Sequence, residues 1–227
     1  MKVLTLSTIF IICFIFAGIA LAQASPQFMI SWKAYNYSPS WYQGKNFPVY
    51  SSPVEISFEL LEDNKIVNLS KNEIRWYINN NLFTKGNGLQ TIRFIPKNQA
   101  GTNISVRIAV ENYKGEELNK FVYIPVKNPE AIINAPYLTG KVKIGQTYQL
   151  NAFPFFFNAS SLNDFSFNWT VNNQSTFPEE NEETQDVLNL TISTSTPSGL
   201  ELNINLTAIN LLQTFEKVTK NLKLIVQ

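Results

Sequence analysis

The chain has 227 residues, 18 basic and 17 acidic side chains, no histidine and a single cysteine. A formal charge near zero leaves no electrostatic footprint for nucleic acid or for an anionic membrane surface. The lack of histidine excludes imidazole-dependent triads and the usual zinc sites, so we expect no cofactor and no metal site.

Residues 1–24 predict a secretory signal peptide. Lys2 precedes an apolar run over residues 3–20, and small residues follow up to Ala22 and Ala24. Basic, apolar and small residues in this order are typical of a signal cleaved after Ala22 or Ala24. The alternative is an uncleaved membrane anchor, because the apolar run approaches the ~20 residues of a spanning helix.

Cleavage would leave a mature chain without cysteine. Cys13 lies inside the apolar run and follows bulky isoleucines, which does not fit a lipidation site. A secreted chain without disulfides must take its stability from packing. We therefore expect an exported protein, located in the periplasm, on the cell surface or outside the cell, with no membrane insertion after cleavage.

Most of the mature chain alternates apolar and polar residues. Residues 54–60, 104–110 and 200–206 show this period of two, and Asn, Gly and Pro clusters such as residues 85–88 separate the runs. Period two predicts half-buried antiparallel strands, and strands at this spacing predict an all-β sandwich or barrel. No stretch after residue 24 shows helical periodicity.

An aromatic-rich segment occupies residues 31–50. In a strand over residues 28–35, Trp32 shares its face with the apolar side chains and is assigned to the core. Trp41 and Tyr42 lie beyond that strand, and long ordered loops are often functional. Two interpretations stay open. The rings close the end of the sandwich against Trp76, or Trp41 and Tyr42 form a binding surface.

An internal repeat is the strongest signal in the sequence. Residues 74–80 read IRWYINN and residues 167–173 read FNWTVNN, and strands follow each motif in the same order. Trp76 and Trp169 have apolar neighbours two residues away, so we assign both to sandwich cores. The Asn-Asn pair after each strand suits a tight hairpin turn, because asparagine tolerates positive φ.

The repeat predicts two domains after the signal peptide. We expect two tandem Ig-like antiparallel β-sandwiches, over residues 25–127 and 128–227, with residues 127–130 at the join. A short linker that contains proline is stiff, so the two domains should form a rod.

Other candidate sites are weaker. The acidic run at residues 179–183 lacks the alternating spacing of a calcium loop, and we interpret it as a solvated loop. No acidic pair is marked out as a glycosidase site, and no catalytic residue is assigned. Eight Asn-x-Ser/Thr triplets are also present. They begin at Asn36, Asn68, Asn103, Asn158, Asn168, Asn173, Asn189 and Asn205.

The tandem W-x-[IV]-N-N strands and the signal peptide resemble the Ig-like or PKD-like modules of bacterial surface and periplasmic proteins. Residues 31–34 and 42–45 are similar to exported proteins of small-genome candidate-phylum bacteria. Asn-Asn stands where a typical PKD module carries a W-x-F-G-D-G-like turn. The resemblance implies spacers, adhesive units or assembly parts, and the fold does not fix which.

Two functions from different classes therefore remain. One is a non-catalytic structural or assembly module of the cell envelope, with other envelope proteins as partners. The alternative is an adhesin or glycan-binding module that uses residues 31–50, with surface glycans as partners.

Overall fold

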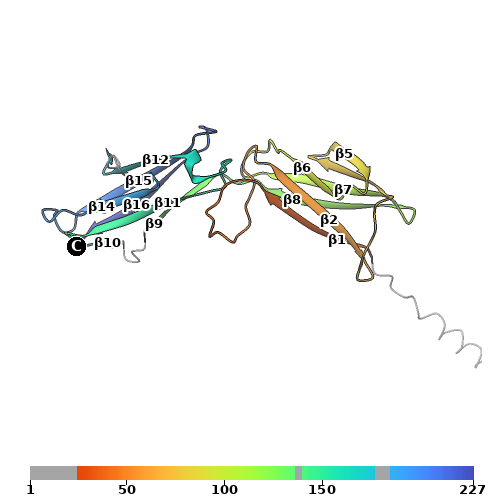
Figure 1. Ribbon diagram of the computed structural model, residues 1–227, viewed down its shortest axis with the longest axis horizontal. Coiled ribbons are helices and arrows are strands. Elements are labelled where there is room, and N and C mark those ends of the chain that lie inside the picture. Colours follow the sequence, from red (N-terminus) through yellow and green to blue (C-terminus); the bar gives the residue numbers. More distant parts are fainter. Residues whose placement is uncertain (1–24, 136–139, 177–184) are drawn as a thin grey trace, which may run out of the picture.

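The computed structural model describes residues 25–135, 140–176 and 185–227 (Figure 1). The expected signal peptide and the whole acidic run at residues 179–183 lie outside the described residues. Among the residues that are described, no helix is long and apolar enough to cross a membrane.

Sixteen strands and one short 3-10 helix make up the described chain. The first domain contains β1 (Gln27–Ala34), β2 (Val54–Glu62), β3 (Lys65–Ile66), β4 (Glu73–Ile78), β5 (Asn81–Asn87), β6 (Thr91–Phe94), β7 (Asn103–Tyr113) and β8 (Glu116–Pro125). The second contains β9 (Glu130–Asn134), β10 (Lys141–Val142), β11 (Thr147–Phe155), η1 (Leu162–Asp164), β12 (Phe165–Val171), β13 (Gln174–Ser175), β14 (Val187–Thr191), β15 (Glu201–Asn210) and β16 (Lys217–Val226).

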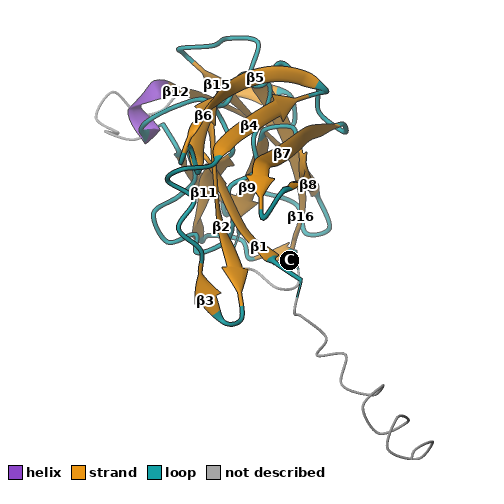
Figure 2. Cartoon of the chain, turned by 90° about the vertical axis from the view of Figure 1, so that its right-hand side faces the viewer, coloured by secondary structure: helices purple, strands orange, loops and turns teal. Residues whose placement is uncertain are grey.

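The first domain is a sandwich of two four-stranded sheets. One sheet pairs β2 with β1, β3 and β6, and the other has the order β5-β4-β7-β8. Figure 2 views the molecule along its long axis, from the end that carries this domain. The alternating side chains of both sheets meet in one apolar cluster that includes Phe58, Trp76 and Ile108. Burying this face is what holds the two layers together.

The second domain repeats this arrangement with β10 added, and none of its described strands corresponds to β3. Its sheets have the orders β14-β11-β9 and β10-β16-β15-β12-β13. A separate apolar cluster, which includes Leu150, Trp169 and Leu206, lies between them. The short strand β10 pairs in parallel with the end of β16, and every other pairing in this domain is antiparallel. The expected fold class is confirmed: the chain forms two tandem Ig-like antiparallel β-sandwiches.

The hairpin after each repeated tryptophan follows the sequence prediction. Asn79 and Asn80 have φ of 49° and 67°, and Asn172 and Asn173 have φ of 49° and 65°. Two successive positive φ values are the signature of a type I′ turn, whose twist matches that of the flanking strands. The Asn-Asn pair therefore sets the turn in both domains.

Two predicted boundaries are wrong. Residues 85–87 were expected in a turn but belong to β5, where Lys85 pairs with Arg75 across the sheet, and only Gly88 turns, with φ of 66°. The last strand of the first domain, which its alternating residues predict over 120–126, begins four residues earlier, at Glu116. In both places pairing with a neighbouring strand overrides local turn preference.

The two sandwiches lie end to end (Figure 1). Residue 25 and the C-terminus are at opposite ends of the long axis, and the chain passes from one domain to the other at β8 and β9. Residues 35–50 leave β1 at this junction, and there they meet the second domain.

Trp76 and Trp169 generate the first testable prediction. Trp76 is fully buried and Trp169 is 5% exposed, each in a different apolar cluster. Trp76→Ala should lower the free energy of unfolding by ~3–5 kcal/mol, because a large cavity replaces the indole. Chemical denaturation measures this, and Trp169→Ala should act mainly on the second domain. A loss below ~1 kcal/mol would contradict the core position.

Candidate functional site: the junction between the two domains

The aromatic segment crosses from the first domain to the second through backbone contacts. Tyr37 donates its N–H to the Phe157 carbonyl at 2.8 Å, and its own carbonyl accepts the N–H of Phe156 at 2.6 Å. The Tyr37 ring packs edge-on against Phe165, at 5.1 Å between centroids. Burial raises the pKa of the Tyr37 phenol, and the charge of Asp186 raises it further. Tyr37 of the aromatic segment therefore pairs with the backbone of the second domain, as a residue of an added strand would.

A third apolar cluster fills the junction. Val49, Phe155 and Phe156 are buried there, and Tyr42 and Phe47 pack against them. Their rings meet at steep angles and at centroid distances of 5.3 Å (Tyr42–Phe155) and 5.9 Å (Phe47–Phe156). Edge-to-face pairs of this kind add to the stabilisation from buried area. The junction therefore has a small core of its own.

Phe156 is the residue that directs rings to both sides of the junction. It has φ of 65°, in the left-handed region that bulky residues avoid. This turn sends the Phe156 ring toward the first domain, while the Phe157 side chain enters the core of the second. Backbone in this region costs on the order of 1–3 kcal/mol and persists where the surroundings fix it.

Beside these rings lies a polar network centred on Asn158. Its amide donates to the Tyr50 carbonyl at 2.8 Å, and its Oδ1 accepts the Ser52 hydroxyl at 2.8 Å. Glu216 accepts three N–H groups from the second domain. They are Asn158 N at 2.8 Å, Asn158 Nδ2 at 2.5 Å and Asn210 Nδ2 at 2.7 Å. Asn158 therefore connects the buried Glu216 carboxylate to the first domain.

The members of this network are nearly removed from water. Ser52 and Asn210 are fully buried, and Glu216 is 4% exposed. A buried carboxylate costs several kcal/mol unless hydrogen bonds replace its lost hydration. Because the donors belong to Asn158 and Asn210, displacing either asparagine would leave the charge without that replacement.

Asn36 makes a second polar connection. Its amide donates to the Phe47 carbonyl at 2.7 Å and to the Phe156 carbonyl at 3.3 Å. Its own carbonyl accepts the Asn46 amide at 3.0 Å, which holds the loop closed. Asn36 and Asn158 both begin Asn-x-Ser triplets, and both side chains are engaged in the junction.

The structure places Trp41 and Tyr42 against the second domain. Trp41 is 56% exposed, yet its ring contacts Phe153 and Phe155 edge-on at 5.2 and 5.9 Å. Tyr42 is half-buried against Phe155, and Gly44 leaves the room into which the Tyr42 ring folds. Trp41 and Tyr42 thus contact rings of the second domain, whereas Trp32 of the same segment packs against the first core, which contains Trp76.

Trp32 lies at the margin of the first core. It is partly buried against the apolar cluster, as its place on the inner face of β1 requires. Its ring contacts Phe47 at 6.1 Å, and the Lys45 ammonium lies 3.5 Å from its centroid. Burial lowers the pKa of Lys45. Trp32 thus links the first core to the junction segment.

Trp76 and Trp169 occupy matching places in the two sandwiches. The Trp76 indole donates to the Leu89 carbonyl at 2.7 Å, and the Trp169 indole donates to the Gln185 carbonyl at 3.1 Å. Each ring is therefore buried with its one polar group satisfied, as buried tryptophans usually are.

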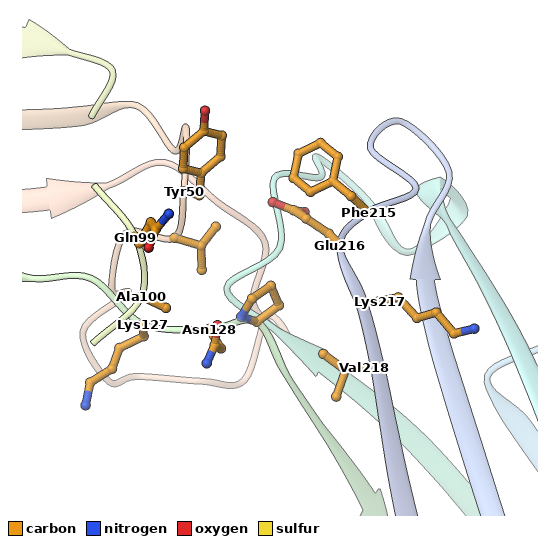
Figure 3. Close-up of a pocket in the computed structure, with 11 residues that line it drawn as sticks. Tyr50, Gln99, Ala100, Lys127, Asn128, Phe215, Glu216, Lys217 and Val218 are labelled. Atoms are coloured by element: carbon orange, nitrogen blue, oxygen red, sulfur yellow. The ribbon is translucent and has the colours of Figure 1, made fainter. Parts of the chain in front are cut away.

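A cleft of about 480 Å³ opens at the junction (Figure 3). Tyr50 and Phe215 stand on its two sides, with ring centroids 6.4 Å apart, and the side chain of Glu216 lies just below them. Lys127 and Lys217 also line it, but their side chains point away from its middle (Figure 3). Among the described residues no group of three or more Asp, Glu, Cys or His side chains could hold a metal ion.

Comparisons with solved structures return chains made of Ig or fibronectin(III)-like modules. The fibronectin(III)-like modules of Clostridium thermocellum CbhA are 13% identical, with a TM-score of 0.31, covering 88% of this chain and 94% of theirs. The Ig1-2 module of the Drosophila receptor protein tyrosine phosphatase DLAR is 14% identical, with a TM-score of 0.28, covering 89% and 98%. DIP-gamma IG1+IG2 is 13% identical, with a TM-score of 0.32, covering 89% and 97%.

At these sequence identities and TM-scores, the similar structures give no information about the function of this chain. No protein-family model matches the sequence, and no curated protein matches it either.

Asn158 generates the second prediction. Asn158→Ala should lower the free energy of unfolding by ~1–3 kcal/mol, because it removes the Nδ2 donor of a buried carboxylate together with the side-chain bonds to Tyr50 and Ser52. Asn168, which begins an Asn-x-Thr triplet, is exposed on β12 and is the matched control. Asn168→Ala should change stability by no more than ~0.5 kcal/mol in the same urea titration. Equal effects of the two changes would refute a structural role for the network.

Proposed function

We propose that the protein is a non-catalytic, exported module of the cell envelope that acts as a rigid two-domain spacer or assembly part. The observation that carries this proposal is the junction. The aromatic segment supplies Tyr42 and Phe47 to a core shared with the second domain, and Asn158 joins the domains through buried hydrogen bonds. A shared core and the buried hydrogen bonds of Asn158 oppose bending between the domains.

The chemistry of the acidic side chains supports a role without catalysis. Hydrogen bonds from basic side chains hold the pKa of three carboxyls below their usual value: Glu62 beside Lys114, Glu73 beside Arg75 and Glu201 beside Lys223. A general acid working near neutral pH needs the opposite shift. These carboxylates fit surface ion pairs rather than proton transfer.

A second candidate, an adhesin or glycan-binding module using Trp41 and Tyr42, rests on one observation. Trp41 keeps 56% of its surface exposed at the edge of the junction. Less of the Tyr42 side chain is accessible to a ligand, because it is half-buried against Phe155.

The rigid-spacer proposal predicts one interdomain geometry in solution. The scattering profile of the mature protein should fit a single extended shape. Phe156→Asn, which keeps a residue tolerant of positive φ but removes the ring, should broaden the distribution of interdomain angles while both domains stay folded. Leu212→Ser, at a residue 63% exposed, is the control. Broad angles in the unmodified protein would overturn the proposal.

If the protein is exported, the mature chain should have one defined amino terminus. Amino-terminal sequencing of protein recovered outside the cytoplasm should begin at Gln23 or Ser25, because Ala22 and Ala24 provide the small residues that cleavage needs. Recovery of intact Met1 would contradict cleavage and favour a retained membrane anchor.

A further inference from the structure

The outer face of the sheet β5-β4-β7-β8 carries an aromatic row. Leu82, Tyr77, Arg107 and Phe121 lie directly opposite one another on neighbouring strands, and Tyr123 follows Phe121 on the same face. The Arg107 guanidinium lies 3.6 Å from the Tyr77 ring centroid. Phe121 and Tyr123 remain 49% and 63% exposed. These two rings therefore offer their surfaces to the solvent.

The second domain provides an internal comparison, because the final strands of the two domains correspond residue by residue. Val126 donates to Thr102 and accepts from Gly101, while Val226 donates to Leu200 and accepts from Gly199. Counting back from these valines, Asn221 corresponds to Phe121 and Lys223 to Tyr123.

The corresponding row of the second domain contains no rings. Thr170, Asn205 and Asn221 lie opposite one another on β12, β15 and β16. Asn221 donates to the Asn205 side chain at 2.7 Å. The same sandwich therefore forms with polar residues in this row, so the fold does not require the exposed rings of the first domain.

The ionic groups around the aromatic row are paired with one another. Because each has a partner of opposite sign, the face offers little net charge to a ligand. The pairs are Arg75 with Glu73 at 2.8 Å and with Glu111 at 2.9 Å, Lys85 with Glu73 at 3.3 Å, and Arg107 with Glu117 at 3.8 Å.

A hollow lined by three amides, a hydroxyl and the Lys97 side chain lies one strand away from these rings. It has a volume of about 510 Å³ and is lined by Asn79, Lys97, Asn98, Gln99 and Thr102. Asn79 donates its N–H to the carbonyl of Ser105, the residue opposite Tyr123. Hydrogen-bonding groups and ring surfaces thus occur on neighbouring strands, and this combination suits a ligand with both hydroxyl groups and apolar C–H faces.

Two features argue against a protein partner on this face. Lys120 and Pro125 stand on the free edge strand β8, and both residue types oppose the addition of another strand. The two half-exposed rings present on the order of 200 Å² of ring surface. A stable protein interface needs about 800 Å² from each partner. The apolar area suits a small ligand segment better.

We propose that Phe121 and Tyr123, together with the amides of the neighbouring hollow, bind a neutral oligosaccharide segment. The rings stack on apolar C–H faces of the sugars, and Asn98, Gln99 and Thr102 bond to their hydroxyl groups. This site is separate from Trp41 and Tyr42 and adds a ligand to the proposed spacer.

The test uses the mature chain, with amide NMR spectra and calorimetry. The probes are β-linked hexasaccharides of glucose, mannose, xylose and N-acetylglucosamine, with galacturonate as the charged comparison. At least one neutral probe should shift the amides of Phe121, Tyr123 and Ser105. The double variant Phe121→Asn, Tyr123→Lys carries the residues that the second domain has at these two positions, so it should fold. It should bind the saccharide about tenfold or more weakly than the unmodified chain does.

Trp41→Ala is the matched control, and it should leave the affinity unchanged. Loss of binding in Trp41→Ala alone would overturn the proposal in favour of the junction, and so would the absence of binding to every neutral probe. Concentration-dependent dimerisation that the Phe121→Asn, Tyr123→Lys variant abolishes would assign the rings to a second copy instead. None of these results depends on interdomain rigidity, which the scattering of Phe156→Asn tests separately.

Discussion

The relation between the two sandwiches depends on the left-handed turn at Phe156. An extended residue there would point the Phe156 ring back toward the second domain, and the first domain would lose the partner of Phe47. The backbone strain of this turn is offset by contacts from the aromatic segment of the first domain, since Tyr37 bonds to Phe156 and Phe157 and Asn36 donates to the Phe156 carbonyl. Strain held in this way fixes one geometry better than a proline linker alone would.

The buried carboxylate of Glu216 adds specificity rather than net stability. Moving a charge out of water costs free energy that its hydrogen bonds only partly return, so an apolar replacement would be as stable. What the carboxylate does is fix the Asn158 amide, whose remaining contacts reach Tyr50 and Ser52 in the other domain. An apolar junction could slide, whereas this network is satisfied in a single arrangement.

Local patterns in the sequence were enough to predict the strands, the Asn-Asn hairpins and the duplication marked by Trp76 and Trp169. Local patterns could not predict the contacts of the junction, because Asn158 and Glu216 are separated by 58 positions in the sequence. One signal was present. Phe155, Phe156 and Phe157 are consecutive, and a strand with one buried face cannot bury three successive rings. The surplus ring implies a second apolar surface, although not which segment covers it.

Comparison of the two domains separates what the sandwich requires from what each copy adds. Ile225 donates its N–H to the Gly140 carbonyl, which holds β10 against β16, and Pro125 at the matching place in the first domain has no N–H to give. The first domain therefore lacks this one bond, although Lys127 donates its N–H to the Pro48 carbonyl just as Gln227 donates to Val142. The segment between its first two long strands thus meets the end of the last strand at Pro48, while its residues 36, 37 and 42 reach the second domain. Pro125 removes one bond of this edge, and it stands on the same strand as the exposed rings of Phe121 and Tyr123.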